Sequence, residues 1–224
     1  MRIRKWIHRF INSLTVKAGL LLYEANDLIA VKTLPQFGND PKNLRIDFPR
    51  RIINPERIFL GDNVMFGPGS FLYALTHYPG VSMQNPERKQ KQQIFDSKIE
   101  IGHRVTATGA LQIASQSEIK IEDDVMFASN VFINDAMHGY KNAIDPYKYQ
   151  KLWKIKPILI KRGSWIGQNV VILPGVTIGE LSIIGANSVV TKSIPKQCIA
   201  FGSPARIIKK WNTNAQKWVP ASEK

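Results

Sequence analysis

The stretch from Ile158 to Val190 reads ILIKRGSWIGQNVVILPGVTIGELSIIGANSVV, and an aliphatic residue recurs in it at every sixth position. Two positions before each of these residues stands a small or β-branched residue. A period of six fits neither an α-helix, whose period is about 3.6, nor a simple alternating strand, whose period is about 2. The pattern instead predicts short strands that are each followed by a tight turn, so that the chain winds into a coil. The recurring residues are Ile160, Ile166, Ile172, Ile178, Ile184 and Val190.

The same six-residue phrase recurs upstream in blocks that begin at Leu60, Ile101 and Ile121. Together the four blocks supply fifteen positions, and all of them are apolar. With three positions in each coil, they predict about five coils with an apolar interior. The interruptions at 73–98 and 134–157, and a two-residue slip near Ser115, each follow a completed trio of apolar positions. A sandwich of short strands is the alternative, but it predicts no such long-range phase. The upstream positions are Leu60, Phe66, Leu72, Ile101, Ala107, Ile113, Ile121, Phe127 and Ile133.

The composition indicates one globular domain. The chain has 224 residues, of which 44% are hydrophobic and 21% charged, enough apolar surface for a core of its own. No apolar run approaches the roughly 18 residues of a membrane span, and no small-residue cleavage site follows the short basic start. Cys198 is the single cysteine, which excludes a disulfide framework and a multi-cysteine zinc site. We therefore expect a cytoplasmic protein.

The formal net charge of +14 requires an explanation. Nucleic acid is one candidate partner, but the basic residues are scattered along the chain and no nucleic-acid-binding motif accompanies them. We therefore expect no nucleic-acid partner. A phosphorylated ligand or an anionic membrane surface fits the charge better.

The first residues predict an amphipathic helix, because apolar side chains recur there at helical spacing. Two roles remain open for it. It can cap the open end of the coil stack, whose edges need cover, or it can attach the protein peripherally to the inner membrane. We divide the chain into an N-terminal helix and cap region (1–57), a β-helix domain (58–195) and a C-terminal extension (196–224). The apolar face comprises Ile3, Trp6, Ile7, Phe10, Ile11 and Leu14, and the basic residues Arg2, Arg4, Lys5 and Arg9 lie largely off it.

The segment 158–211, which continues TKSIPKQCIAFGSPARIIKKW after Val190, resembles the end of the hexapeptide-repeat acyltransferases. It is similar to galactoside and maltose acetyltransferases, and more so to O-acetyltransferases of capsule and lipopolysaccharide pathways. The strong resemblance covers residues 99–211. It implies an all-β, left-handed parallel β-helix that forms a homotrimer and uses acetyl-CoA as co-substrate.

The catalytic candidate is His138, in the segment NVFINDAMHGY and five residues after Ile133. The resemblance implies that this histidine is the general base, and neutral imidazole suits the removal of a proton from a sugar hydroxyl near neutral pH. Many relatives read Asp-His-x-His-Gly here, whereas this chain has alanine in place of the first histidine. We assign Asp135 to the catalytic group with His138, which it can orient, and the alternative is that it simply stabilises the turn. His77, in LTHYPG, is the second candidate base.

The resemblance also places acetyl-CoA along the last two coils. Lys and Arg are the expected partners of its phosphate groups. No metal is expected, since the histidines show no converging trio, and Cys198 is a weak candidate nucleophile because no histidine lies near it in the repeat. The implied contacts are Trp165 and Ala186 beside the pantetheine arm, Thr191 and Lys192 following it, and Arg206 with Lys209 at the phosphates.

The acceptor is expected to be a sugar or glycan, with His77 and Tyr140 on its side of the site. Thr108 and Gln116 stand where sugar acetyltransferases have an Asn and an Asp, which disfavours a galactoside. We therefore expect acetyl-CoA-dependent O-acetylation of a sugar hydroxyl in surface polysaccharide or lipopolysaccharide biosynthesis. The alternatives are N-acetylation of a nucleotide-linked amino sugar and a β-helix without turnover. The groups that stabilise the oxyanion are not identifiable from the sequence.

Overall fold

The computed structural model describes residues 2–80, 87 and 91–221, with backbone alone for residues 2–10 and 26. Parts of the predicted insertion (81–86 and 88–90) and of the predicted C-terminal extension (222–224) therefore lie outside the described residues.

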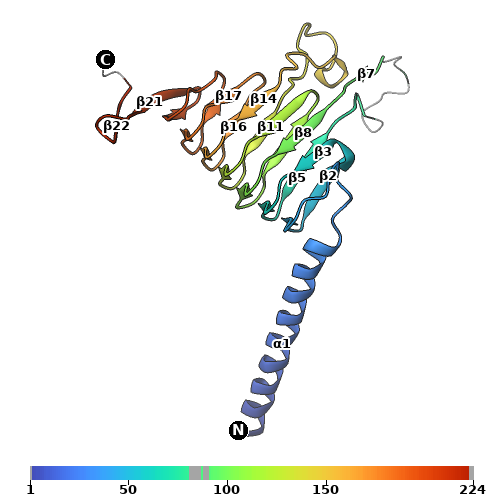
Figure 1. The fold of residues 1–224 in the computed structure, drawn as a ribbon. Helices are drawn as coiled ribbons and strands as arrows, with labels where there is room; N and C mark the ends of the chain where they lie inside the picture. The colour runs from blue at the N-terminus through green and yellow to red at the C-terminus, as the bar shows by residue number, and fades with distance from the viewer. Residues whose placement is uncertain (1, 81–86, 88–90, 222–224) are drawn as a thin grey trace.

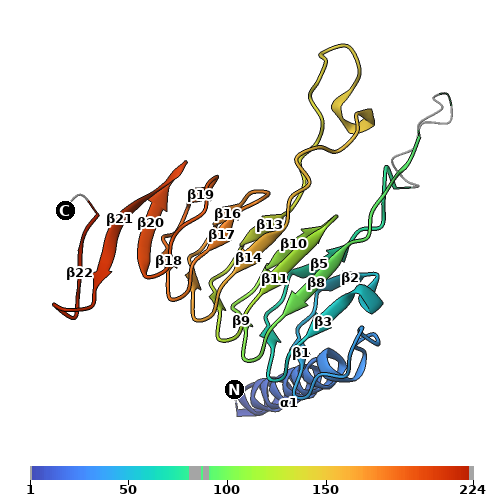
Figure 2. The same cartoon turned by 45° about the horizontal axis from the view of Figure 1, so that its top comes forward.

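The described chain winds around a triangular prism, visiting three parallel sheets in turn (Figures 1 and 2). We name these sheets faces A, B and C, and the corners between them edges AB, BC and CA. Face A contains β1 (Arg45–Ile46), β4 (Met65–Phe66), β9 (Thr106–Ala107), β12 (Met126–Phe127), β15 (Trp165–Ile166), β18 (Ile183–Ile184) and β20 (Cys198–Gly202). Face B contains β2 (Arg50–Ile53), β5 (Ser70–Ala74), β10 (Gln112–Ser115), β13 (Phe132–Asn134), β16 (Val171–Ile172) and β19 (Val189–Val190). Face C contains β3 (Ile58–Leu60), β8 (Lys98–Ile101), β11 (Glu118–Ile121), β14 (Ile158–Ile160) and β17 (Thr177–Ile178).

The core consists of the apolar positions that the six-residue period singles out. All fifteen are buried, and the most exposed of them, Ala107, has only 6% of its surface accessible. Parallel pairing sets each anchor directly above the next, as in Ile113 opposite Ile133 and Ile133 opposite Ile172. The predicted β-helix with an apolar interior is therefore confirmed.

The stack begins earlier than the sequence predicts. The strands β1 and β2 precede β3, which carries the first predicted position, so the stack begins at Arg45, inside the segment 1–57 that we assigned to a cap. Ile52 stands in register with Leu72, and Leu60 with Ile101. The six-residue phase breaks between Ile52 and Leu60 because the 3₁₀ turn η1 (Pro55–Arg57) lengthens that corner.

The helix α1 (Arg2–Lys32) extends away from the stack and does not cap it, contrary to one of the two predicted roles (Figure 1). Among its described side chains only Ala30 is buried. The first coil is covered instead by the loop that follows the helix, in which Phe37 joins the core and the Asn39 amide pairs with both backbone groups of Leu60. The loop thus supplies hydrogen-bond partners to the exposed edge of the first coil. The helix is not needed for that purpose and remains available for another role. No helix in the described ranges combines the length and apolarity that a bilayer crossing requires.

Both long insertions leave the stack at edge BC (Figure 2). The first carries the antiparallel strands β6 (His77–Tyr78) and β7 (Gln93–Ile94), and the second carries the 3₁₀ turn η3 (Tyr147–Tyr149). The Gln93 side chain joins them, since its amide donates to the Leu152 carbonyl at 3.1 Å and its oxygen accepts from the Leu152 N–H at 2.7 Å.

The C-terminal extension continues face A. β21 (Ala205–Asn212) pairs antiparallel with β20, and β22 (Lys217–Pro220) pairs antiparallel with β21. This ribbon closes the last coil at the end of the stack that lies opposite the helix (Figure 1).

Candidate active site

His138 lies where the second insertion leaves edge BC, and its side chain is exposed. Its Nδ1 atom lies 3.2 Å from the hydroxyl oxygen of Tyr78 on the first insertion. The two rings meet edge to face with their centres 5.5 Å apart. An imidazole that is held at one nitrogen and exposed to solvent is suited to accept a proton from a bound substrate.

Tyr78 is a member of this site that the sequence analysis missed. Only 7% of its surface is exposed, and burial raises the pKa of its hydroxyl, which keeps the group protonated. The segment LTHYPG drew attention to His77, but adjacent residues of a strand point to opposite sides. On β6 the Tyr78 side therefore faces His138, while the exposed His77 contacts the Thr76 hydroxyl at 3.2 Å. The geometry favours His138 over His77 as the base.

Asp135 does not orient His138, contrary to one of the two predicted roles. Its fully buried carboxylate accepts hydrogen bonds from the N–H groups of Gln116 and Ser117 at 2.7 and 2.8 Å and from the Ser115 hydroxyl at 2.9 Å. Burial raises the pKa of Asp135, and these donors oppose that rise. The residue therefore fixes the corner of the coil below His138, which is the turn-stabilising alternative.

An aromatic pair lies on the second insertion, where backbone pairing anchors it next to His138 in the chain. Tyr140 is 56% exposed and packs edge-on against Trp153, with ring centres 4.9 Å apart. Trp153 is held by backbone pairing with Met137, the residue before His138. An exposed aromatic ring beside the base is a suitable platform for a sugar, which supports the acceptor-side placement of Tyr140.

The residues predicted to bind acetyl-CoA fall into separate groups on one chain. Thr191 and Lys192 lie at edge BC, the edge that also carries His138. Ala186 lies at edge AB, Trp165 on face A, and Arg206 and Lys209 on β21, which extends face A. In a triangular prism face A is opposite edge BC, so a single chain does not bring all of these residues together.

The predicted phosphate contacts are accessible. Lys192, Arg206 and Lys209 are exposed and form no ion pair within the part of the chain that the structure describes. Among the described residues, the Arg206 guanidinium donates only to the neighbouring carbonyl of Ala205, at 2.9 Å. Unpaired Lys and Arg side chains are suited to phosphate binding.

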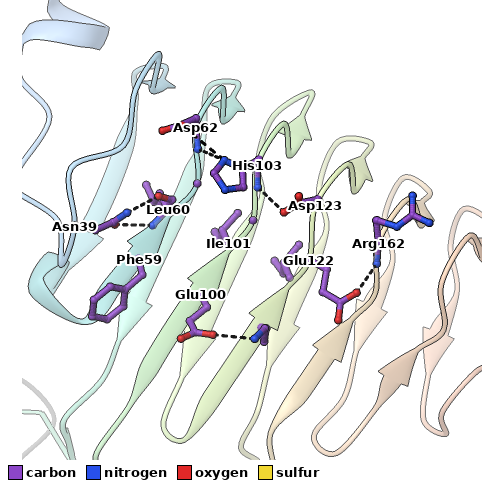
Figure 3. A pocket seen from close by; sticks show the side chains of 14 residues that line it. Asn39, Phe59, Leu60, Asp62, Glu100, Ile101, His103, Glu122, Asp123 and Arg162 are labelled. Atoms are coloured by element: carbon purple, nitrogen blue, oxygen red, sulfur yellow. Dashed lines mark hydrogen bonds and ion pairs between the residues drawn. The ribbon is translucent and has the colours of Figure 1, made fainter.

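A groove of about 520 Å³ lies along edge CA (Figure 3), and His138 is not among the residues that line it. Its polar groups bond to one another from coil to coil. The Asp62 N–H donates to His103 Nδ1 at 2.9 Å, the His103 N–H donates to Asp123 at 2.9 Å, and Glu122 accepts from the Arg162 N–H at 3.0 Å. None of the predicted site residues lines this groove, so the candidate active site remains the one at edge BC.

Two other kinds of chemistry find little support. Within residues 2–80, 87 and 91–221, no three His, Cys, Asp or Glu side chains are grouped as metal ligands would be. Cys198 is buried and burial raises the pKa of its thiol, which disfavours the reactive thiolate.

Comparison with known proteins identifies the family. The family model described as bacterial transferase hexapeptide (six repeats) matches residues 157–192. The putative lipopolysaccharide biosynthesis O-acetyl transferase WbbJ of Escherichia coli K12 is 33% identical over 187 residues, which cover 80% of this chain and 86% of that protein. The chain belongs to the hexapeptide-repeat acyltransferases. Its coil is therefore a left-handed parallel β-helix, as the resemblance implies.

Other members of the family match over shorter spans or at lower identity. The galactoside O-acetyltransferase of E. coli K12 is 39% identical over 118 residues, covering 53% of this chain and 57% of that enzyme. Among solved structures, a point mutant of the N-acyltransferase AntD from Bacillus cereus, in complex with dTDP and coenzyme A, has a TM-score of 0.61 at 23% identity. That likeness covers 78% of this chain and 84% of AntD and shows the shared fold.

Replacement of Asp135 tests its structural role. In Asp135→Ala two backbone N–H groups lose their buried acceptor, each at a cost of about 1–3 kcal/mol. We expect urea denaturation to show an unfolding free energy lower by about 2–6 kcal/mol. The control Asp40→Ala removes an exposed carboxylate and should stay within about 0.5 kcal/mol of the wild type. Equal stability of the two variants would contradict the corner role.

Proposed function

We propose that this protein transfers an acetyl group from acetyl-CoA to a sugar hydroxyl in lipopolysaccharide or surface polysaccharide biosynthesis, with His138 as general base. The observation that carries the proposal is the exposed imidazole at edge BC, held at Nδ1 by Tyr78 beside an exposed aromatic ring. The similarity to WbbJ over most of both chains supports the acceptor class.

The mechanism follows from this geometry. The Nε2 atom of His138, which bonds to none of the described residues, takes the proton of the sugar hydroxyl as the hydroxyl oxygen attacks the thioester carbonyl carbon. A tetrahedral oxyanion forms, and its collapse breaks the carbon–sulfur bond. The coenzyme A thiolate leaves and takes the proton from Nε2. Proton transfer by a positioned histidine contributes roughly 10²–10⁴-fold to such a reaction.

We propose a homotrimer in which the donor lies between face A of one chain and edge BC of the next. Trp165, Arg206 and Lys209 would contact acetyl-CoA from one chain, and His138 with Lys192 from its neighbour. Face A supports the proposal because large apolar side chains are exposed on its outer surface, as at an uncovered interface: Met65 (53%), Met126 (47%), Trp165 (46%) and Phe201 (51%).

The second candidate function is N-acetylation of a nucleotide-linked amino sugar. It is favoured by the likeness in fold to AntD, one of whose mutants was crystallised with dTDP-4-amino-4,6-dideoxyglucose and coenzyme A. An amine and a hydroxyl place the same demand on His138, so the acceptor assay decides between the two.

We further propose that α1 lies on an anionic membrane surface on the cytoplasmic side, where an enzyme acting on lipid-linked sugars would meet its acceptor. The helix projects from the stack, and apolar side chains in its described part are exposed, among them Leu14 (60%) and Leu21 (66%). Its first residues combine Trp and Phe on one face with basic residues off that face, the composition of interfacial helices.

The base role is tested with His138→Ala in an assay of acetyl-CoA-dependent thiol release, using free glycans and nucleotide-linked amino sugars as acceptors. We expect release with glycans, and a kcat lower by about 10²–10⁴-fold in the variant, because the proton acceptor is lost. Coenzyme A binding and the fold should persist. The control His103→Ala, at edge CA, should retain activity.

Release with amino sugars alone would favour N-acetylation, and absence of both release and coenzyme A binding would favour a non-enzymatic β-helix. Near-normal turnover of His138→Ala would assign the base role elsewhere.

A site between chains predicts complementation between inactive variants. His138→Ala and Arg206→Ala each disable one side of the site, the second by weakening phosphate binding. Refolding an equal mixture should place an intact edge BC next to an intact face A in about a quarter of the sites of a symmetric ring. Activity should therefore rise to about a quarter of the wild-type value. If activity in the mixture stays at the level of the separate variants, the site lies within one chain.

The membrane proposal predicts that the full-length protein sediments with vesicles of phosphatidylcholine and phosphatidylserine but not with phosphatidylcholine alone. Each basic residue near an anionic surface contributes about 1 kcal/mol, so replacing Arg2, Arg4 and Arg9 by Gln should weaken binding roughly 100-fold. High salt should have a similar effect. Unchanged sedimentation of the variant, or loss of its oligomeric state, would point to helix–helix association instead.

A further inference from the structure

We propose that Tyr78 is a positioning residue that fixes the tautomer of His138, holding the proton on Nδ1 so that Nε2 is free to act as base. The inference rests on the proposed function for its catalytic consequence. The contact itself is a feature of the geometry at edge BC.

The direction of the hydrogen bond follows from the position of a third group. The Tyr78 hydroxyl oxygen lies 2.5 Å from the carbonyl oxygen of Lys148. A carbonyl oxygen can only accept, and two oxygens at that separation repel unless a hydrogen lies between them. The single proton of the Tyr78 hydroxyl is therefore committed to Lys148.

His138 must then be the donor in the second contact. At 3.2 Å from Nδ1, the Tyr78 oxygen has only lone pairs to offer, so the hydrogen of this bond comes from the imidazole. In neutral imidazole one nitrogen carries the proton and the other accepts. Protonation of Nδ1 therefore leaves Nε2 with the lone pair that the reaction requires.

The surroundings of Tyr78 hold its hydrogen bond with His138 in place. Tyr78 is almost fully buried, and burial raises the pKa of its hydroxyl, so the group does not ionise near neutral pH. Its partners Lys148 and His138 both lie on the second insertion, whereas Tyr78 lies on the first. The insertions are joined a second time by Gln93 and Leu152. Tyr78 thus positions the base only while the two insertions remain docked.

The contact also persists when His138 changes its protonation state. When Nε2 gains the substrate proton, the ring becomes an imidazolium whose Nδ1–H still points at the Tyr78 oxygen. The same bond thus serves both protonation states, and no rearrangement is needed between the attack and the collapse of the intermediate.

The test is ¹⁵N NMR of the histidine rings in the full-length protein, together with steady-state kinetics, for wild type and Tyr78→Phe. We expect neutral His138 in the wild type to be protonated at Nδ1. Loss of the hydroxyl should shift it toward the Nε2–H form and lower kcat by about 10- to 100-fold, with the KM for acetyl-CoA unchanged. The control Tyr73→Phe, on β5, should alter neither measurement.

A wild-type His138 protonated at Nε2 would overturn the proposal without the need for any variant. An unchanged tautomer in folded Tyr78→Phe would also overturn it. A changed tautomer with undiminished kcat would support the positioning contact and contradict the base role of His138 in the proposed function. The two proposals therefore fail by different results.

Discussion

Parallel hydrogen bonding between successive coils is the constraint on which the rest of the molecule depends. Each strand pairs in fixed register with the strand of the same face in the previous coil and in the next coil. Side chains along a strand therefore alternate between core and solvent. Ile113, Ile133 and Ile172 are thereby stacked inside. Any extra residues must leave at a corner, since an insertion within a strand would turn its apolar set outward. In the described chain the extra residues gather at edge BC, from the short turn η1 to the two long insertions.

This gathering is what creates the site. Tyr78 and His138 are 60 residues apart in the sequence, yet they belong to consecutive insertions at one edge and meet above the corner 115–117. Asp135 secures that corner through three hydrogen bonds. The base therefore stands on a loop whose start is fixed by the coil and whose far side is fixed by another loop. Such support from two directions holds a catalytic group more precisely than a free surface loop would.

The sequence predicted the parts of the molecule that obey the repeat. The fifteen anchors, the two insertions and the place of His138 all follow from one period and its phase. The strands β1 and β2 were not predicted, because η1 adds residues between Ile52 and Leu60 and breaks the six-residue phase. Tyr78 escaped because its role depends on a contact between distant insertions, which no local pattern encodes, and its neighbour His77 carries the more familiar chemistry. Asp135 was predicted to be catalytic, with turn stabilisation as the alternative, and only the structure shows that its partners lie at the corner 115–117.

The position of the insertions also bears on assembly. Edges AB and CA keep short corners throughout the described coils, so face A, which lies between them, is the face that nothing obstructs. Its exposed methionines and Trp165 form an apolar strip along it. Face A is also opposite the edge that carries His138, so two chains packed with face A of one beside edge BC of the other would join the two halves of the predicted donor site. A neighbour related by a closed rotation repeats that contact at every interface. A single coil, with short corners on either side of face A and insertions at the opposite edge, would thus supply the two different surfaces that the proposed ring requires.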